Sequence, residues 1–242
     1  AREIHGVLHF LIQAKVEPGN VNCVQLSPTL QATKSNYTRV HHGKSPKFLE
    51  WFVDRSRSRV LLDQLQSEQG ARFLHKRNRN IIIEVRDELP DDPDFVWLTL
   101  GQIKRLMAVD NIVNMDLRTV VSGIPFGQES PGREPACFAA AMRHSATTAA
   151  TPFLPLDDII SWFTGQKVRF DLQVSPCDLR QIPDWELTDD CLRHKGEQFF
   201  RVIFVDVEIS NREVTAWQQP LVEPAREGII AFVVKRIRGV HH

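Results

Sequence analysis

Residues 13–42 hold the densest group of side chains in this chain that are able to do chemistry. Their sequence, QAKVEPGNVNCVQLSPTLQATKSNYTRVHH, combines amides, hydroxyls, both signs of charge and the only tyrosine, Tyr37. Such side chains are poor material for a hydrophobic core, but they offer many hydrogen-bond donors and acceptors. The segment therefore predicts a site that binds a small polar ligand.

Lys15 and Glu17 are spaced for acid–base chemistry. They are two positions apart, so on a β-strand their side chains project from the same face. A carboxylate base would then lie beside a cation that stabilises an oxyanion. The alternative is a solvated pair on a surface sheet face. Glu68 in QSEQ and Asp116 in NMDLR are further candidate bases, each set among amides.

Tyr37 is a candidate general acid or hydrogen-bond donor, with its phenol tuned by Lys34 or Arg39 nearby. The alternative is an aromatic side chain that packs while its hydroxyl meets solvent. His41 and His42 titrate near neutrality and are able to move protons, although adjacent histidines on a loop are more often simply exposed.

The densest basic cluster is Lys76, Arg77 and Arg79 in HKRNRN. Arginine forks suit phosphate oxygens through paired hydrogen bonds, so the cluster predicts anion binding, with a solvated charge run as the alternative. RNA is disfavoured because no glycine-aromatic RNA-binding motif or zinc-ligand spacing accompanies it. Trp217 and Gln218 offer an indole and an amide that are able to stack on and hydrogen-bond a flat polar ligand, or else the indole packs in a core.

Composition excludes several classes of protein. The 242 residues are 42% hydrophobic, and 30 basic residues balance 30 acidic ones, so no overall field favours nucleic acid or an anionic membrane. No apolar run is long enough to span a bilayer. The four cysteines have no repeating spacing, which predicts reduced thiols in a cytoplasmic protein and no metal site.

Hydrophobic periodicity predicts a mixture of strands and helices. Apolar even positions predict a strand over 7–17, and the β-branched run predicts a buried strand over 80–85. Thr99 is expected to cap a helix, with Gln102 at the capping-box position. A second helix is expected to follow Asp157 or Asp158, and a short one lies around 137–143. Further strands are expected near 168–174, 199–209 and 229–237.

Few of these strands alternate regularly with helices, so an α+β arrangement is preferred to a doubly wound parallel sheet. The Pro-, Ala- and Ser-rich stretch 127–155 is expected to be a linker between residues 1–126 and 156–242.

Several motifs, in this order, resemble the NDP-hexose 2,3-dehydratases of deoxysugar biosynthesis. The first half contributes QAKVEPGN, VQLSPTLQATKSNYTRVH, LQSEQGARFLHKRNRN, WLTLGQI and DNIVNMDLRTV. The second half contributes ISWFTGQK, FFRVIFVDVEISNREVTAWQQPL and GIIAFVVKRIRGV. The resemblance covers nearly everything except the linker.

This resemblance implies a cofactor-independent lyase that acts on a dTDP-4-keto-6-deoxyhexose, often as a homodimer. It implies a Nudix-like mixed sheet with flanking helices, and parts of two tandem repeats. Tyr37, Glu17 and Lys15 are the candidate catalytic residues. The candidate substrate-binding residues are polar or aromatic side chains in or beside these motifs: Gln13, Gln25, Ser27, Asn36, Arg39, Gln66, Glu68, Lys76, Arg77, Arg79, Asn114, Asp116, Arg118, Trp217 and Gln218.

The two ends of the chain have similar sequences. Residues 2–7 read REIHGV and residues 235–240 read KRIRGV, so both occupy the same place in the implied repeat. We therefore expect residues 1–126 to be the back half of a first repeat and residues 156–242 the front half of a second. The chain is then a fragment, or its halves close cyclically, with strands near both termini pairing in one sheet or exchanged between partner chains.

Two other functions remain open from the sequence. One is a non-catalytic module that binds a dTDP-sugar, which would keep the ligand contacts and lack the reaction. The other is metal-dependent hydrolysis of the Nudix type, which the absence of a helix carrying a string of glutamates disfavours.

Overall fold

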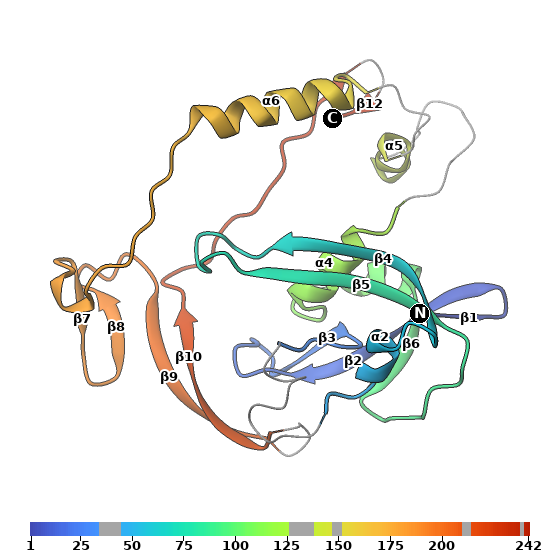
Figure 1. Ribbon diagram of the computed structural model, residues 1–242, viewed down its shortest axis with the longest axis horizontal. Helices are drawn as coiled ribbons and strands as arrows, with labels where there is room; N and C mark the ends of the chain where they lie inside the picture. Colours follow the sequence, from blue (N-terminus) through green and yellow to red (C-terminus); the bar gives the residue numbers. More distant parts are fainter. Residues whose placement is uncertain (34–44, 126–137, 147–151, 210–213, 238–239) are drawn as a thin grey trace. The chain divides into compact units, whose positions relative to one another are not determined.

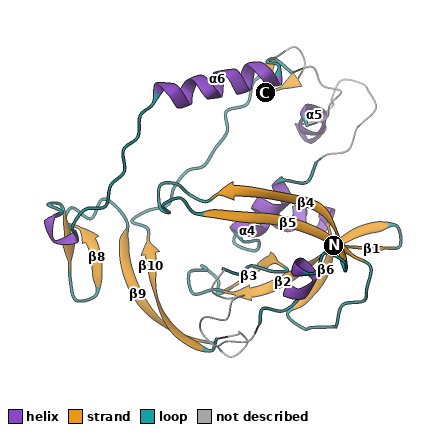
Figure 2. Ribbon diagram, viewed as in Figure 1, coloured by secondary structure: helices purple, strands orange, loops and turns teal. Residues whose placement is uncertain are grey.

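The computed structural model describes residues 1–33, 45–125, 138–146, 152–209, 214–237 and 240–242. The described chain mixes several antiparallel sheets with few helices (Figures 1 and 2). It divides into two compact units, Ala1–Ile124 with Phe204–Leu221, and Pro125–Ile203 with Val222–His242. The α+β class expected from the sequence is confirmed at this level.

The central strand of the first unit is β2 (Val7–Val16), which pairs with β1 (Arg2–Ile4), β3 (Val24–Pro28) and β6 (Phe95–Thr99). The turn from β1 to β2 uses His5 and Gly6, both at positive φ, as a two-residue hairpin requires. The expected strand is confirmed. Its odd face, however, is no solvated surface, because Leu11 and Lys15 on that face are buried, at 6% and 7% exposure.

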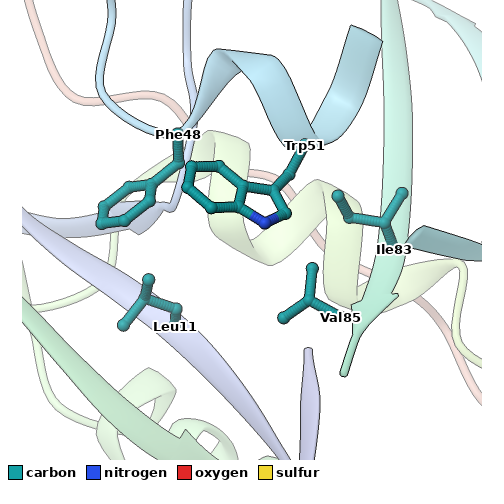
Figure 3. Packing of buried hydrophobic residues seen from close by; sticks show 5 residues of the cluster. All are labelled: Leu11, Phe48, Trp51, Ile83 and Val85. Atoms are coloured by element: carbon teal, nitrogen blue, oxygen red, sulfur yellow. The ribbon is translucent and has the colours of Figure 1, made fainter. Parts of the chain in front are cut away.

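A second sheet of this unit is the long hairpin of β4 (Ser58–Ser67) and β5 (Arg77–Val85). Ile83 and Val85 on one face of β5 pack with Leu11 of β2. The short helix α2 (Leu49–Val53) adds Trp51, whose ring lies between the strands of the two sheets (Figure 3). This hydrophobic cluster joins the hairpin to the four-stranded sheet.

Helices α3 (Leu100–Met107) and α4 (Met115–Ser122) cover the other face of the four-stranded sheet. Ile12 from β2, Ile103 from α3 and Leu117 from α4 belong to one buried cluster. Helix α4 also packs against β3 and β5. The first turn of α4 therefore lies beside both strand systems, which matters for the site.

Thr99 begins α3 with the capping box that the sequence predicts. The Thr99 hydroxyl accepts from the Gln102 amide nitrogen at 3.2 Å, and the Gln102 side chain accepts from the Thr99 amide at 2.9 Å. Together they satisfy two donors that the first helical turn would otherwise leave without partners.

Thr99→Ala is expected to lower the free energy of unfolding by about 1 kcal/mol, because one of these donors loses its acceptor. Chemical denaturation followed by circular dichroism measures the change. Thr119→Ala, at a half-buried position within α4 that caps no helix, is the matched control, and an equal loss in both variants would contradict a specific capping effect.

The second unit contains α5 (Phe138–Ser145), α6 (Leu156–Arg169) and a 3-10 turn, η1 (Leu179–Gln181). A further sheet has the order β10-β9-β8-β7, from Trp185–Leu187 (β7) and Cys191–His194 (β8) of this unit, and from Arg201–Glu208 (β9) and Ala216–Glu223 (β10), most of whose residues belong to the first unit. The helix expected around 137–143 and the strand expected over 199–209 are both confirmed, whereas Cys137 lies outside the described residues. None of the described helices is long and apolar enough to cross a membrane.

Three expectations for this unit are wrong. No strand forms over 168–174, because α6 continues to Arg169 and the following residues are extended without pairing. Residues 229–235 form no strand either, and only β11 (Arg236–Ile237) pairs with β12 (Val240–His241). Pro155 occupies the N-cap of α6 without a side-chain hydrogen bond, so neither Asp157 nor Asp158 caps that helix.

The similar sequences at the two ends form similar hairpins. Ile4 pairs with Val7 across the first turn, and Ile237 pairs with Val240 across the second. In the described residues β1 and β11 belong to separate sheets, so they do not pair in one sheet of a single chain, while the fragment and the exchange between partner chains stay predictions.

Candidate functional site

The site begins on a polar face of the β2–β3 pair. Lys15 lies opposite Gln25 and Gln13 lies opposite Ser27, and residues directly opposite in a sheet project from the same face. Glu17 follows on that face at the end of β2. The strand register therefore gathers the polar residues that the sequence places at alternate positions.

Lys15 and Glu17 form an ion pair with 3.3 Å between Nζ and Oε1. The Lys15 side chain is only 8% exposed and that of Glu17 is 27% exposed. Lys15 Nζ also donates to the Gln31 carbonyl oxygen at 3.2 Å, and Gln31 Nε2 donates to Glu17 Oε1 at 3.1 Å. The pair is thus held in a partly buried network, in which Lys15 is buried and Glu17 keeps some contact with solvent.

The second wall of the site is the first turn of α4. Leu26 of β3 bridges in parallel to Val113, with the Asn114 amide donating to the Leu26 carbonyl at 2.9 Å. Asn114 then caps α4 through its side-chain oxygen, which accepts from the Leu117 amide at 2.9 Å. This arrangement places Asp116 in the first turn, beside the polar face of β2 and β3.

The third wall is the tip of the β4–β5 hairpin. Glu68 accepts from Lys76 Nζ at 2.7 Å and from Asn78 Nδ2 at 2.8 Å, both at Oε2. The neighbouring Asn80 is buried and donates to Gln66 Oε1 at 2.8 Å. These cross-strand contacts fix the carboxylate and the ammonium group at the end of the hairpin nearest to the start of α4.

Charged side chains of the β2–β3 pair and of the hairpin tip both act on the Asp116 carboxyl. Burial raises the pKa of its carboxyl above the usual 3.8, and the negative charges of Glu17 and Glu68 raise it further, while Lys15 and Lys76 oppose them. Three carboxylates and two ammonium groups thus share one region, and their combined effect with burial shifts the pKa of Asp116 upward, toward the protonated form. Such a group suits proton donation.

Asp116→Asn is expected to raise the melting temperature at pH 7 by roughly 1–3 °C. Because the pKa of Asp116 is higher in the native state than in the unfolded state, the native state binds more protons, and stability falls as pH rises through that range. The gain should therefore disappear near pH 3, where both states are protonated. Melting curves at the two pH values measure it, and an equal gain at both would contradict this origin.

The other candidate residues are placed away from this cluster or serve local structure. Arg79 pairs with Asp63 on the exposed face of the hairpin, so the predicted basic cluster is split and only Lys76 joins the site. Arg118 donates to the Val113 carbonyl at 3.1 Å. Arg77 is exposed on β5. Gln218 donates to Asp206 at 2.7 Å on an exposed strand face.

Trp217 donates through Nε1 to Gln219 at 2.6 Å. It also lines a cavity of about 230 Å³ with Glu17, Asn20 and Cys23. Its ring is therefore near one member of the charged cluster. The candidate residues Tyr37, Asn36 and Arg39, together with His41 and His42, lie outside the described residues.

Sequence reasoning missed Gln31 and Asn78. Gln31 stands in the polar stretch 13–42, which was a signal, but its contacts with Ser27 and Asn114 depend on how the chain folds. Asn78 was passed over because its neighbours in HKRNRN are cationic, although it alternates with them along β5 and so projects from the opposite face.

Among the described residues, no three histidine, cysteine, aspartate or glutamate side chains are grouped so as to hold a metal ion. Cys191 is buried and contacts Thr188, while His194 accepts from the Gly196 amide.

Comparison with known proteins places the chain in a family. The model of the family described as NDP-hexose 2,3-dehydratase matches residues 1–124 and 156–242. The dTDP-4-dehydro-6-deoxy-alpha-D-glucopyranose 2,3-dehydratase of Saccharopolyspora spinosa is 47% identical over all of this chain and 50% of that protein. Proteins of the same description from Amycolatopsis orientalis and Streptomyces violaceoruber are 43% and 44% identical, over 100% and 98% of this chain and 47% and 52% of their own lengths.

The chain thus spans about half the length of the curated relatives that it matches. The motifs that carry the candidate site, from QAKVEPGN to DNIVNMDLRTV, fall within the matched residues 1–124. The chain belongs to the NDP-hexose 2,3-dehydratase family.

Proposed function

We propose that this chain takes part in removing water across C2 and C3 of a dTDP-4-keto-6-deoxyhexose. The observation that carries the proposal is the cluster of Lys15, Glu17, Glu68, Lys76 and Asp116. It combines a buried ion pair, a carboxyl with a raised pKa and several amide donors in one place. The relatives named as dTDP-4-dehydro-6-deoxy-alpha-D-glucopyranose 2,3-dehydratases support this substrate class.

The reaction needs a base, an acid and stabilisation of an oxyanion. The 4-keto group acidifies the hydrogen on C3, so a base removes that proton and the electron pair forms an enolate at C4. The C2 hydroxyl then departs with a proton as water, leaving a C2–C3 enol. Protonation at C2 gives the 3,4-diketo-2,6-dideoxy sugar, so substrate equals product plus water.

We assign the base to Glu17 and the oxyanion-stabilising cation to Lys15. Their 3.3 Å ion pair places a carboxylate and an ammonium group where one substrate can contact both. Low exposure of Lys15 strengthens its attraction for a developing enolate oxygen. Asp116 is the proton donor to the departing hydroxyl, since its surroundings favour the protonated form.

Tyr37 remains a predicted alternative to Asp116 as the acid. Lys76 is the cation that we assign to the nucleotide diphosphate, because it lies at the exposed end of the hairpin tip. The Nudix-like fold, the tandem repeats with boundaries at 1–126 and 156–242, the homodimer and the cytoplasmic location also stay predictions.

A non-catalytic module that binds a dTDP-sugar is the second candidate. It is favoured by the amide and ammonium donors around the cluster, since such groups are able to bind a sugar nucleotide without acting as acid or base. This candidate predicts binding without release of water.

The test is to incubate the full chain with dTDP-4-keto-6-deoxyglucose, with and without EDTA, and to follow the sugar nucleotide by mass spectrometry. Loss of water that EDTA leaves unchanged is expected. Binding without loss of water would favour the second candidate, and release of a nucleoside monophosphate that requires magnesium would favour hydrolysis and contradict the proposal.

A further inference from the structure

Gln31 contacts both members of the ion pair that we assign to catalysis. Its side-chain Nε2 donates to Glu17 Oε1 at 3.1 Å, and its backbone carbonyl accepts from Lys15 Nζ at 3.2 Å. A closed ring of contacts therefore runs from Lys15 to Glu17 to Gln31 and back to Lys15. A glutamine in this place is able to fix the direction of the carboxylate.

The Gln31 amide is itself oriented by two donors on its other side. Its Oε1 accepts from the Ser27 hydroxyl at 3.0 Å and from Asn114 Nδ2 at 3.2 Å. A flipped Gln31 amide would bring its NH2 group against the NH2 group of Asn114, with no acceptor between them. The two donors therefore turn the Gln31 NH2 group toward Glu17.

The orientation of Asn114 is set in turn by α4. Its Oδ1 accepts from the Leu117 amide as the helix N-cap, so its Nδ2 is directed away from the helix and toward Gln31. Ser27 and Asn114 are both buried, with exposures of 0% and 6%, where competing water is scarce. A single chain of oriented amides thus leads from the start of α4 to the carboxylate of Glu17.

We propose that Gln31 is a positioning residue that holds the Glu17 carboxylate, through Oε1, in the direction needed to remove the C3 proton. Both the Gln31 amide and the Lys15 ammonium group bind Oε1, which assigns Oε2 to the substrate. This inference rests on the proposed function, because it gives a direction to the base of that reaction. Gln31 also connects Asn114, the N-cap of the helix that carries Asp116, with the proposed base Glu17.

The competing explanation is that Gln31 serves only to satisfy Ser27 and Asn114, since buried polar groups without partners are costly. Gln31→Glu separates the two roles. A glutamate keeps an oxygen acceptor for Ser27 and Asn114, but it replaces the donor facing Glu17 with a second carboxylate oxygen. Gln31→Met, of similar length, removes both kinds of contact.

The test compares kcat and KM for dehydration in the full chain and its variants. Gln31→Glu and Gln31→Met are each expected to lower kcat about tenfold or more, with KM changed less than about threefold, because a charge-assisted hydrogen bond to the base is lost. Gln64→Met, the same change on the exposed part of β4, is the control and should keep its kcat. Unchanged kcat in Gln31→Glu, or an increase in KM alone, would overturn the proposal.

A second measurement does not depend on turnover. The side-chain amide resonances of Gln31, assigned by their loss in Gln31→Met, are expected to move in the nitrogen-15 spectrum of Glu17→Gln. If the wild-type chain neither dehydrates nor exchanges C3, the proposed function fails, and this spectrum alone decides whether Gln31 orients residue 17. Resonances that stay in place would overturn that orientation.

Discussion

Glu17→Gln is expected to lower the rate of dehydration by about 10²- to 10⁴-fold, the usual contribution of a general base. The amide has almost the same shape as the carboxylate, so Lys15 and Gln31 keep an oxygen to bind at this position. The amide oxygen, however, is far too weak a base to take the C3 proton. Rates of water loss, followed by mass spectrometry at saturating substrate, measure the effect.

The control for this variant is Glu50→Gln, which makes the same chemical change on the exposed side of α2. It should keep the wild-type rate. Affinity for the sugar nucleotide should change little in Glu17→Gln, since the proposed role of Glu17 is proton removal. Wild-type turnover by Glu17→Gln would remove Glu17 from the mechanism and transfer the role of base to another carboxylate of the cluster.

Trp51→Ala is expected to lower the free energy of unfolding by about 3–5 kcal/mol, as truncation of a large buried aromatic residue usually does. Trp51 is 7% exposed and packs with Leu11, Ile83 and Val85 between the two strand systems (Figure 3). Its removal leaves a cavity where the β4–β5 hairpin meets the sheet. Urea denaturation followed by circular dichroism measures the loss.

Trp51→Phe is the matched comparison for this prediction. Phenylalanine keeps most of the apolar contact and removes the indole N–H, which is buried without a hydrogen-bond partner among the described residues. Trp51→Phe should therefore lower the free energy of unfolding much less than Trp51→Ala does. Equal losses in the two variants would show that the cluster depends on the full indole and not on apolar volume.

Much of the first unit follows from local sequence. Alternation of apolar residues predicts β2, the isoleucine run predicts β5, and Thr99 with Gln102 predicts the start of α3. These features depend on residues close together in the chain, and so does the pairing of Lys15 with Glu17. Local spacing is sufficient to place Lys15 and Glu17 on the same face, because the side chains of a strand alternate between its faces.

The second unit shows where local sequence fails. The apolar run 229–235 has strong β propensity but forms no strand in this structure, because a strand needs a partner as well as suitable residues. The strand predicted near 168–174 does not form, because the preceding helix α6 extends to Arg169. Composition alone did not indicate where that helix would stop.

The composition of the site was predictable, but its geometry was not. Glu17, Glu68 and Asp116 were each candidates, yet no local pattern relates residues separated by up to ninety-nine positions in the sequence. Their approach depends on the bridge of Leu26 to Val113 and on the packing of α4 against β5. Gln31 was missed for the same reason, since its importance lies in contacts to distant residues.

The most direct test of the proposed reaction is to incubate the full chain with dTDP-4-keto-6-deoxyglucose in deuterated water and to observe C2 and C3 by NMR. We expect loss of the C3 hydrogen, departure of the C2 hydroxyl and entry of deuterium at C2 of the product. A substrate that keeps its C3 hydrogen and its C2 hydroxyl, under conditions where it is bound, would contradict the account.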